Sequence, residues 1–439
     1  MTKTDVLKKA QKDRIKFVDL WFSDILGAVK NVTIPIGELK KALNEGIWFD
    51  GSSVEGFGRI FESDMYLKPD PDTFAVIPWG EEKTARLICD AYSPDHRPAP
   101  VDPRSTLKAN LALLHKQGME FYVGAELEFY LFRRDGDKVI ALPHDRVGYF
   151  DLGGDLALRI RKKMCKRLQE FGIEVEAGHH EVGRGQHEID LLYTTALRMS
   201  DNILTARMVI KRVAEENGLY ATFMPKPIFG TAGNGMHVHQ SIFRTRKNQF
   251  SNPRDSYGLS QTAYGYLAGV LKHIKEICAI TSPLVNSYKR LVSGFEAPVY
   301  ICWGTMNRSA LVRVPRISRK KYTSTRLELR SCDPSANPYL LFAAVLRAGI
   351  DGIQAGLKPP KPVEENVFQI EMDVLKTKGI DLLPRSLWEA LNYYQKSKLA
   401  KKALGDVLFQ RYYDTKMKEW EEYSIQVSKW EHDTYLELY

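Results

Sequence analysis

Apolar residues recur with a two-residue period in several short stretches of the chain, and this period is typical of strands rather than helices. The clearest stretch is 124–132, in which apolar residues alternate with Glu126 and Glu128. Side chains at positions i and i+2 project from the same face of a strand, so the two carboxylates lie side by side. Two like charges at that separation repel each other unless a cation lies beside them. The stretch therefore predicts a metal site on one face of a sheet.

Two more segments, 235–241 and 325–330, have a similar alternation. The polar residues that share a face in them are His237, His239, Ser241, Arg326, Glu328 and Arg330. A sheet with one face in water explains any single strand of this kind. Solvated faces are usually rich in Thr, Lys and Ser, however, so Glu, His and Arg at these positions favour a binding site.

Segment 178–190 adds two more acids, Glu181 and Glu188. Because Gly183 and Gly185 lie between them, we expect two strand ends joined by a turn. The candidate metal ligands are then Glu126, Glu128, Glu181, Glu188, His237 and Glu328. Most of these offer hard oxygen atoms, which favour Mg²⁺ or Mn²⁺ over zinc. There are enough of them for two or more ions in one site.

A second group of candidate residues is basic. Its members are Arg290, Arg308, Arg313, Arg326 and Arg330. Guanidinium groups bind carboxylates and phosphates bidentately and keep their charge, so arginines beside divalent cations indicate phosphoryl transfer near a carboxylate substrate. The chain contains neither G-x-x-x-x-G-K-[ST] nor G-x-G-x-x-G. P-loop and Rossmann modes of nucleotide binding are therefore excluded, and any ATP must be held by metals and side chains.

The order of the predicted elements indicates an α+β chain of two domains. Four prolines between residues 94 and 103 disfavour any regular element, so we place the domain boundary at about residue 103. Domain 1–103 is predicted to begin with a short helix over residues 1–13, followed by a hairpin, and its segment 48–59 is rich in glycine and predicted to be a loop. In domain 104–439, predicted helices alternate with predicted strands, and the part from residue 387 onward is mostly helical.

Composition and charge add little to this picture. The 439 residues are 44% hydrophobic, which is ordinary for a globular protein, and the formal net charge is +9. That charge is the only support for a nucleic-acid partner, and we expect none. The five cysteines are scattered without a C-x-x-C pair, and no run approaches the ~18–20 apolar residues of a membrane span. We therefore expect a reduced, cytoplasmic protein without membrane contact.

Several motifs carry a resemblance to a known family. They are Phe49-Asp50-Gly51-Ser52-Ser53, Glu126-Leu127-Glu128-Phe129, His179-His180-Glu181-Val182, Gly185-Gln186-His187-Glu188, Met224-Pro225-Lys226-Pro227, Gly235-Met236-His237, Asn286-Ser287-Tyr288-Lys289-Arg290, Asn307-Arg308-Ser309 and Asp333-Pro334-Ser335-Ala336-Asn337-Pro338. Together, and in this order, they resemble glutamine synthetases of the bacterial and archaeal type, in their short form. Each motif is weak alone, but the set is highly specific.

The resemblance implies a fold, an assembly and a reaction. The fold is an N-terminal β-grasp domain followed by a catalytic domain with a curved antiparallel sheet flanked by helices. The assembly is a homododecamer of two hexamer rings with active sites between neighbouring subunits. The reaction is the ATP-dependent ligation of ammonium to the γ-carboxylate of glutamate, through γ-glutamyl phosphate. Two arginine-flanked metals would neutralise the transferred phosphoryl group, and a closed site would protect that intermediate from water.

The resemblance also assigns roles to single residues. One metal would be held by Glu128, Glu181 and Glu188, and a second by Glu126, His237 and Glu328. Glutamate would bind Gly233, Arg290 and Arg330, and ATP would contact Glu176, His239, Ser241 and Arg313. Arg308 would stabilise the transferring phosphoryl group, in contact with both substrates. Asp50 of the next subunit would take a proton from ammonium, Glu296 would close the site over glutamate and accept a second proton, and Arg59 would mediate feedback inhibition.

One departure from the family pattern concerns the substrate loop. The family usually has Asn where this chain has Ala232, so the side chain expected beside the substrate amino group is missing. This leaves open a γ-glutamyl ligase for a polyamine or another primary amine. A relative that has lost catalysis and serves a structural or regulatory role is a further alternative. Such a relative would lack some of the metal ligands or catalytic bases, whereas this chain has all of them.

Overall fold

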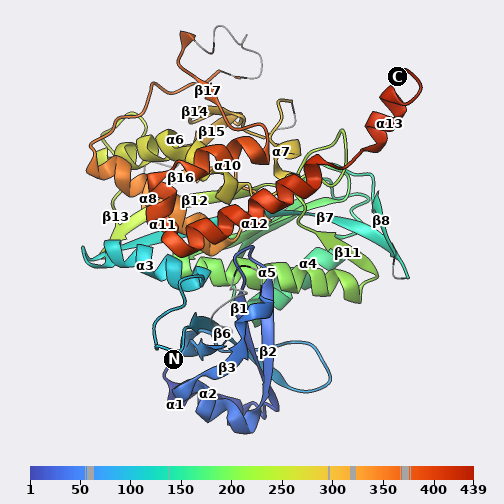
Figure 1. The fold of residues 1–439 in the computed structure, drawn as a ribbon, viewed down its shortest axis with the longest axis vertical. Helices are drawn as coiled ribbons and strands as arrows, with labels where there is room; N and C mark the ends of the chain where they lie inside the picture. Colours follow the sequence, from blue (N-terminus) through green and yellow to red (C-terminus); the bar gives the residue numbers. More distant parts are fainter. Residues whose placement is uncertain are drawn as a thin grey trace.

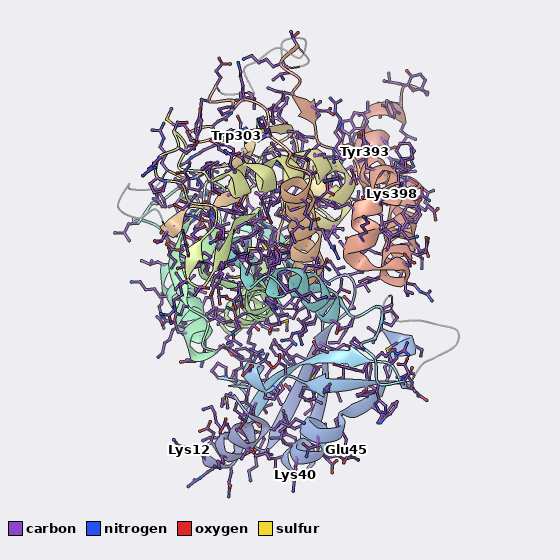
Figure 2. All side chains as sticks on the ribbon, turned by 90° about the vertical axis from the view of Figure 1, so that its left-hand side faces the viewer. Lys12, Lys40, Glu45, Trp303, Tyr393 and Lys398 are labelled. Atoms are coloured by element: carbon purple, nitrogen blue, oxygen red, sulfur yellow. The ribbon has the colours of Figure 1, made fainter. Side chains whose placement is uncertain are left out.

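The computed structural model of this chain describes every residue except 55, 57–63, 137, 295–296, 317–322, 366, 368–374 and 376. The chain forms a smaller N-terminal part and a larger part built on a long sheet with helices packed against it (Figure 1). Figure 2 shows Lys12, Lys40 and Glu45 at the free end of the N-terminal part, and Trp303 in the larger part. None of the helices in the described ranges is long and apolar enough to cross a bilayer.

The N-terminal sheet is mixed. Its described strands are β1 (Phe17–Ser23), β2 (Val29–Pro35), β3 (Ile47–Asp50), β4 (Asp64–Pro69), β5 (Ala75–Val76) and β6 (Thr84–Tyr92). They lie in the order β2-β1-β6-β4-β3, with β5 on β6, and only the β1–β6 pair among these printed registers is parallel. Helices α1 (Lys3–Lys12) and α2 (Leu39–Glu45) bury Val6, Leu39 and Leu43 in the core of this part. The arrangement agrees with the expected β-grasp domain.

One expectation for this part was wrong: residues 48–50, predicted as loop, form most of β3. The loop was predicted from the glycine content of the segment, whereas the strand is stabilised by aromatic packing. The ring of Phe49 lies 5.0 Å from that of Phe22, and the ring of Trp48 lies 5.2 Å from that of Tyr66, measured between centroids. The Trp48–Tyr66 contact joins paired residues of β3 and β4, whereas the Phe49–Phe22 contact packs β3 against the more distant strand β1. Both contacts stabilise an extended backbone up to Asp50.

The large sheet is antiparallel except where β14 and β15 run parallel. Its strands in the described residues are β7 (Met119–Asp135), β8 (Lys138–Pro143), β9 (Val175–His180), β10 (Gln186–Thr195), β11 (Leu219–Thr222), β12 (Met236–Arg244), β13 (Lys247–Asn248), β14 (Tyr300–Gly304), β15 (Ala310–Arg313), β16 (Leu327–Leu329) and β17 (Asp381–Leu382). The main path is β17-β14-β15-β16-β12-β7-β10-β9. The 17-residue strand β7 lies inside this path, between β12 and β10, so both of its edges are paired.

Helices cover the apolar side of this sheet (Figure 1). They are α3 (Pro103–His115), α4 (Leu158–Glu170), α5 (Ala196–Glu216), α6 (Gln261–Thr281), α7 (Ser287–Arg290), α8 (Pro338–Gln354), α10 (Leu387–Gln395), α11 (Lys398–Leu404) and α12 (Asp406–Ser424). The last helix, α13 (Lys429–Tyr435), projects away from the body, and none of its residues is buried. Leu127 and Phe129 of β7 are fully buried on the helical side, which leaves the carboxylates of that strand on the opposite face.

Several contacts among the described residues join the N-terminal part to the larger part, and two of them involve buried polar side chains. Gly27, in the β1–β2 hairpin, has a φ of +84°, and a Cβ there would lie 2.9 Å from the Cα of Asn337. The Asn337 Nδ2 donates to the Asp24 carbonyl at 3.1 Å. The second contact centres on Arg104, which lies in α3 just after the predicted boundary at residue 103. That boundary stays a prediction, because the two parts are tightly joined there.

The contact at Arg104 is a buried ion cluster. Its guanidinium lies 2.7 Å from Asp70, 2.9 Å from Asp90 and 3.0 Å from Asp201. Asp70 and Asp90 belong to the N-terminal part, whereas Asp201 lies in α5 and also accepts a hydrogen bond from Tyr339 at 2.6 Å. Because every charge in the cluster has an opposite partner, it can remain buried. It fixes the N-terminal sheet against the helices that support the site.

Candidate active site

Strand register brings the acidic and histidine side chains into adjacent rows. In one row, Glu126 of β7 lies opposite His237 of β12 on one side and Asp190 of β10 on the other. In the next row, Glu128 lies opposite Glu188. The period-two alternation of each strand puts these side chains on one face, and pairing in this register then gathers them.

Glu126 is held by two histidines. Its Oε2 lies 2.7 Å from His237 Nδ1, and its Oε1 lies 2.6 Å from His239 Nε2. Burial opposes ionisation of Glu126, but the hydrogen bonds from these rings outweigh it and lower the pKa of the carboxyl. Arg326 donates from Nε to His239 Nδ1 at 3.2 Å, which fixes the far side of the second ring. Glu126 is therefore an anion with a defined orientation.

The carboxyls of Glu188 and Asp190 are in the opposite situation. Burial and the nearby charge of Glu128 raise the pKa of Glu188, and burial and Glu126 raise the pKa of Asp190 to about 7. His179 Nε2 lies 3.0 Å from Glu188 Oε1, but burial lowers the pKa of that histidine. The neighbouring carboxylates repel one another here, and a bound cation would offset this repulsion.

Glu328 lies behind the others and is completely buried. Arg313 donates to its Oε2 at 2.5 Å, Arg330 binds its Oε1, and His237 Nδ1 lies 4.0 Å away. Burial opposes ionisation, but Arg330 leads the opposing charges that lower the pKa of Glu328. This carboxylate therefore connects the acidic rows to the arginines.

These residues surround a cavity of about 310 Å³, which we call the acidic cavity. Its lining includes Glu126, Glu128, Glu181, Glu188 and His237 among the acidic and histidine residues, together with Arg290, Arg308, Arg313 and Arg330. Glu181 follows β9 directly, and the Val182 amide donates to its Oε2 at 2.9 Å. Carboxylates thus meet guanidinium groups inside one cavity, as phosphoryl transfer to a carboxylate requires.

The donor set fits a divalent cation. Glu126, Glu188 and His237 each offer one ligand atom within 4.8 Å of the others, and the same holds for His179, Glu188 and Asp190. Carboxylate oxygens dominate these groups, which suits Mg²⁺ or Mn²⁺. The first group takes members of both predicted metal sets, so the two sets lie next to each other. Their division into two sites stays a prediction.

The predicted glutamate residues form one wall of the acidic cavity. Arg290 is 4% exposed, and its guanidinium donates to the Ser331 and Cys332 carbonyls at 2.9 and 3.1 Å. A Cβ at Gly233 would lie 2.5 Å from the Pro225 carbonyl oxygen and 2.9 Å from the Arg290 Cγ, so only glycine fits there. The loop around Gly233 therefore packs directly against Arg290, and both residues line the acidic cavity.

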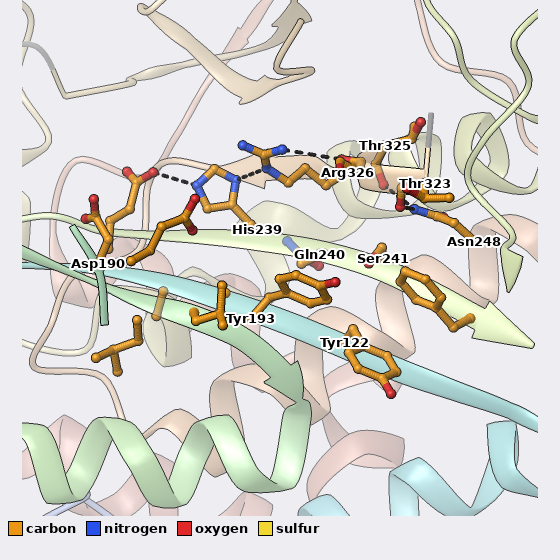
Figure 3. Close-up of a pocket in the computed structure, with 18 of the residues that line it drawn as sticks. Tyr122, Asp190, Tyr193, His239, Gln240, Ser241, Asn248, Thr323, Thr325 and Arg326 are labelled. Atoms are coloured by element: carbon orange, nitrogen blue, oxygen red, sulfur yellow. Dashed lines mark hydrogen bonds and ion pairs between the residues drawn. The ribbon is translucent and has the colours of Figure 1, made fainter. Parts of the chain in front are cut away.

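Figure 3 shows a second cavity, of about 260 Å³. It shares Glu126 and Asp190 with the acidic cavity and therefore adjoins it. Three of the predicted ATP residues, Glu176, His239 and Ser241, line it. The rings of Tyr122 and Tyr193 give it an apolar floor (Figure 3). This cavity combines an aromatic floor with polar side chains and with the acids that it shares with the acidic cavity. Such a lining suits a nucleotide whose phosphates point toward metal ligands.

Comparison with known proteins decides the family. Residues 14–94 match the glutamine synthetase β-grasp domain, and residues 100–435 match the glutamine synthetase catalytic domain. The chain belongs to the glutamine synthetase family. It is 48% identical over 442 residues to glutamine synthetase of Clostridium saccharobutylicum, and 46% identical over 444 residues to that of Staphylococcus aureus strain MW2. Each alignment covers 100% of this chain and 99% of the relative.

Solved structures have the same fold as this chain. A GmaS/ADP complex has a TM-score of 0.88 and 32% sequence identity, over 99% of this chain and 100% of that one. Plasmodium falciparum glutamine synthetase, solved by cryo-electron microscopy, has a TM-score of 0.89 at 24% identity, over 99% of each chain. The second likeness is to the fold alone. The predicted family and fold class are thereby confirmed.

Most of the predicted site residues of this family member lie in or beside the two cavities. Three do not. Asp50 is exposed at the end of β3, where its carboxylate accepts from the Ser52 amide at 2.8 Å, and it does not line the acidic cavity of its own chain. Glu296 and Arg59 lie outside the described residues. The roles assigned to individual residues all remain predictions.

The structure adds four residues to which sequence reasoning gave no role in the site. Asp190, His179, Gln186 and Tyr149 all line the acidic cavity. The alternation that selects Glu188 extends to Asp190 and could have found it. Tyr149 lies in the loop between β8 and α4, where no periodic pattern marks it.

Proposed function

We propose that this protein catalyses the ATP-dependent ligation of ammonia to the γ-carboxylate of L-glutamate through γ-glutamyl phosphate, giving L-glutamine, ADP and phosphate. The observation that carries the proposal is the pair of adjoining cavities, one acidic and edged with arginines, the other floored by tyrosines. Membership of the glutamine synthetase family supports the same reaction.

Each wall of the site contributes one part of this chemistry. Glu126, Glu128, Glu181, Glu188, His237 and Glu328 would hold divalent cations, which when bound neutralise phosphate charge. Arg290, Arg330 and Gly233 would orient glutamate, with its γ-carboxylate toward the nucleotide cavity. Glu176, His239, Ser241 and Arg313 would hold ATP, and Arg308 would stabilise the phosphoryl group in transfer.

A panel of amines tests the reaction and its alternative. The purified protein, with glutamate, ATP and Mg²⁺, should release phosphate with ammonium and form glutamine. Ala232 lines the acidic cavity where a polar side chain is expected, and this favours testing methylamine and polyamines beside ammonium. Phosphate release with an amine but not with ammonium would overturn the proposed reaction in favour of a γ-glutamyl ligase for that amine. Release with neither would favour a non-catalytic relative.

The protein is proposed to work as a homo-oligomer, with a dodecamer of two hexamer rings as the specific expectation. The exposed C-terminal tail supports self-association, because Ile425, Trp430 and Leu438 expose 78%, 63% and 73% of their surface. The position of Asp50, exposed and outside its own cavity, is consistent with a site completed by a neighbour. Native mass measurement of the full chain tests this, and a monomer at working concentration would overturn it. A cytoplasmic location and feedback control through Arg59 also remain predictions.

A further inference from the structure

One buried carboxamide connects three separate parts of the acidic cavity. Gln186, the first residue of β10, is 1% exposed. Its Nε2 lies 3.1 Å from Glu128 Oε2, 3.1 Å from the Gly233 carbonyl and 3.3 Å from Asn234 Oδ1. Its Oε1 accepts from the Gly183 amide at 2.9 Å. The side chain therefore touches a predicted metal ligand, the loop predicted to bind glutamate, and the turn between β9 and β10.

Only a carboxamide satisfies all these partners. The Gly183 amide needs an acceptor, whereas the Glu128 carboxylate and the Gly233 carbonyl need donors. These partners also fix which end of the Gln186 amide is nitrogen, since the reverse orientation would put its oxygen against a carboxylate. A glutamate at position 186 would keep the acceptor but lose both donors and add a charge beside Glu128.

The contacts of Gln186 determine which oxygen of Glu128 is free. Glu128 Oε2 accepts from Gln186 and also from the Gly235 amide at 2.7 Å. Its Oε1 lies 3.9 Å from His237 Nε2. Glu128 is thereby oriented to present one oxygen, Oε1, toward the other candidate ligands, with the second oxygen already occupied.

We propose that Gln186 is a positioning residue that couples cation binding at Glu128 to glutamate binding at the loop 230–235. The same NH₂ group donates to Glu128 and to the Gly233 carbonyl, so the position of one constrains the other. A cation and glutamate each favour the same placement of this amide, and binding of one therefore tightens binding of the other. The inference rests on the proposed function for the identity of the two ligands.

Tyr130 offers a contrast within the same loop. It is fully buried in β7, and its hydroxyl donates to the Ala232 carbonyl at 2.7 Å. Among the described residues its hydrogen-bond partners are Ala232 and Thr231, neither of which is acidic. Tyr130 therefore supports the glutamate loop without connecting it to Glu128. Removing its hydroxyl should weaken glutamate binding alone.

The test measures equilibrium binding rather than turnover. Mn²⁺ is titrated into the full-length protein by calorimetry, with and without saturating glutamate. In the wild type, glutamate should tighten Mn²⁺ binding by about 5-fold or more, the range of ordinary allosteric coupling. In Gln186→Met, Mn²⁺ alone should bind about 10-fold more weakly, as for other partners of metal ligands. The effect of glutamate on Mn²⁺ affinity should be lost in that variant.

Three further variants separate positioning from general damage. Gln186→Glu should also lose the coupling between glutamate and Mn²⁺ binding. It replaces Gln186→Met as the test if that variant does not fold. Tyr130→Phe should bind glutamate more weakly but keep Mn²⁺ affinity. Asn110→Leu removes a buried amide whose Nδ2 donates to the Ala403 carbonyl at 2.8 Å, outside both cavities, and should leave Mn²⁺ and glutamate binding unchanged.

The effect of glutamate on Mn²⁺ affinity is the measurement that decides whether Gln186 has this role. A wild-type protein without coupling, a Gln186 variant that keeps it, or an Asn110 variant that loses it to the same degree would each overturn the role of Gln186. Failure of the proposed function looks different, since the wild type would then bind no glutamate or form no glutamine.

Discussion

His237 and Glu126 face each other across the β12–β7 pair, with His237 Nδ1 2.7 Å from Glu126 Oε2. They are 111 positions apart in the chain, and their contact exists because two long strands pair in this register. The pair lies at the junction of the two cavities, since Glu126 lines both. Four further consequences of the structure can be measured.

His237→Ala should abolish most of the glutamine-forming activity. The imidazole is a candidate ligand, so its loss should cost more than the roughly 10–100-fold typical of groups that only support a ligand. Mn²⁺ titration should show weaker binding in the same variant. His115→Ala, at an exposed position of α3, is the matched control and should behave as wild type. Equal effects in both variants would contradict a ligand role for His237.

Cation binding should strengthen as pH rises through neutrality. The pKa of Asp190 is raised to about 7 and that of Glu188 is raised as well, so in the metal-free protein these acids keep their protons to a higher pH than ordinary carboxyls do. A cation must displace them, so binding should release on the order of one proton near neutral pH. Calorimetry in two buffers of different ionisation enthalpy measures this release. Asp190→Asn should flatten the pH dependence near 7, and a pH-independent wild type would contradict the argument.

Arg104→Met should destabilise the junction between the N-terminal part and the larger part. Removing the guanidinium leaves Asp201 buried without its cationic partner and leaves Asp90 with Lys108 alone. Breaking a buried pair in this way typically costs about 3–5 kcal/mol of unfolding free energy. The urea midpoint, measured at one fixed protein concentration, should fall accordingly. Arg212→Met, which removes exposed pairs on α5, should change stability by less than about 1 kcal/mol. Similar shifts in both would mean that the Arg104 cluster contributes no more than a surface pair.

Ala232→Asn should improve glutamate binding. The side chain at 232 lines the acidic cavity, and one added hydrogen bond to a charged substrate group is worth about 1.5–3 kcal/mol, which corresponds to roughly 10- to 150-fold in KM. The KM for ATP should not change. Ala232→Leu, of similar volume but without polar atoms, should not show the gain. If the Asn variant instead changes the preferred amine, the position selects the amine rather than gripping glutamate.

Much of the site could be predicted from local pattern. The alternation in β7 placed Glu126 and Glu128 on one face, and the glycines after Glu181 predicted the turn that leads to Glu188. These predictions hold because side-chain direction in a strand depends only on residue spacing. The strand at 48–50 was missed because its stability comes from Phe22 and Tyr66, which are distant in sequence.

By itself, then, the sequence determined which faces of the strands are acidic, which chemistry those faces favour, and, through its ordered motifs, the family. Only the tertiary structure decided the strand register that places Glu126 between His237 and Asp190. It also revealed which groups Gln186 contacts, because hydrogen bonds that join three segments leave no pattern in any one of them. The physical reason is that the face of a side chain is a local property, whereas the partners of a polar group are fixed by long-range packing.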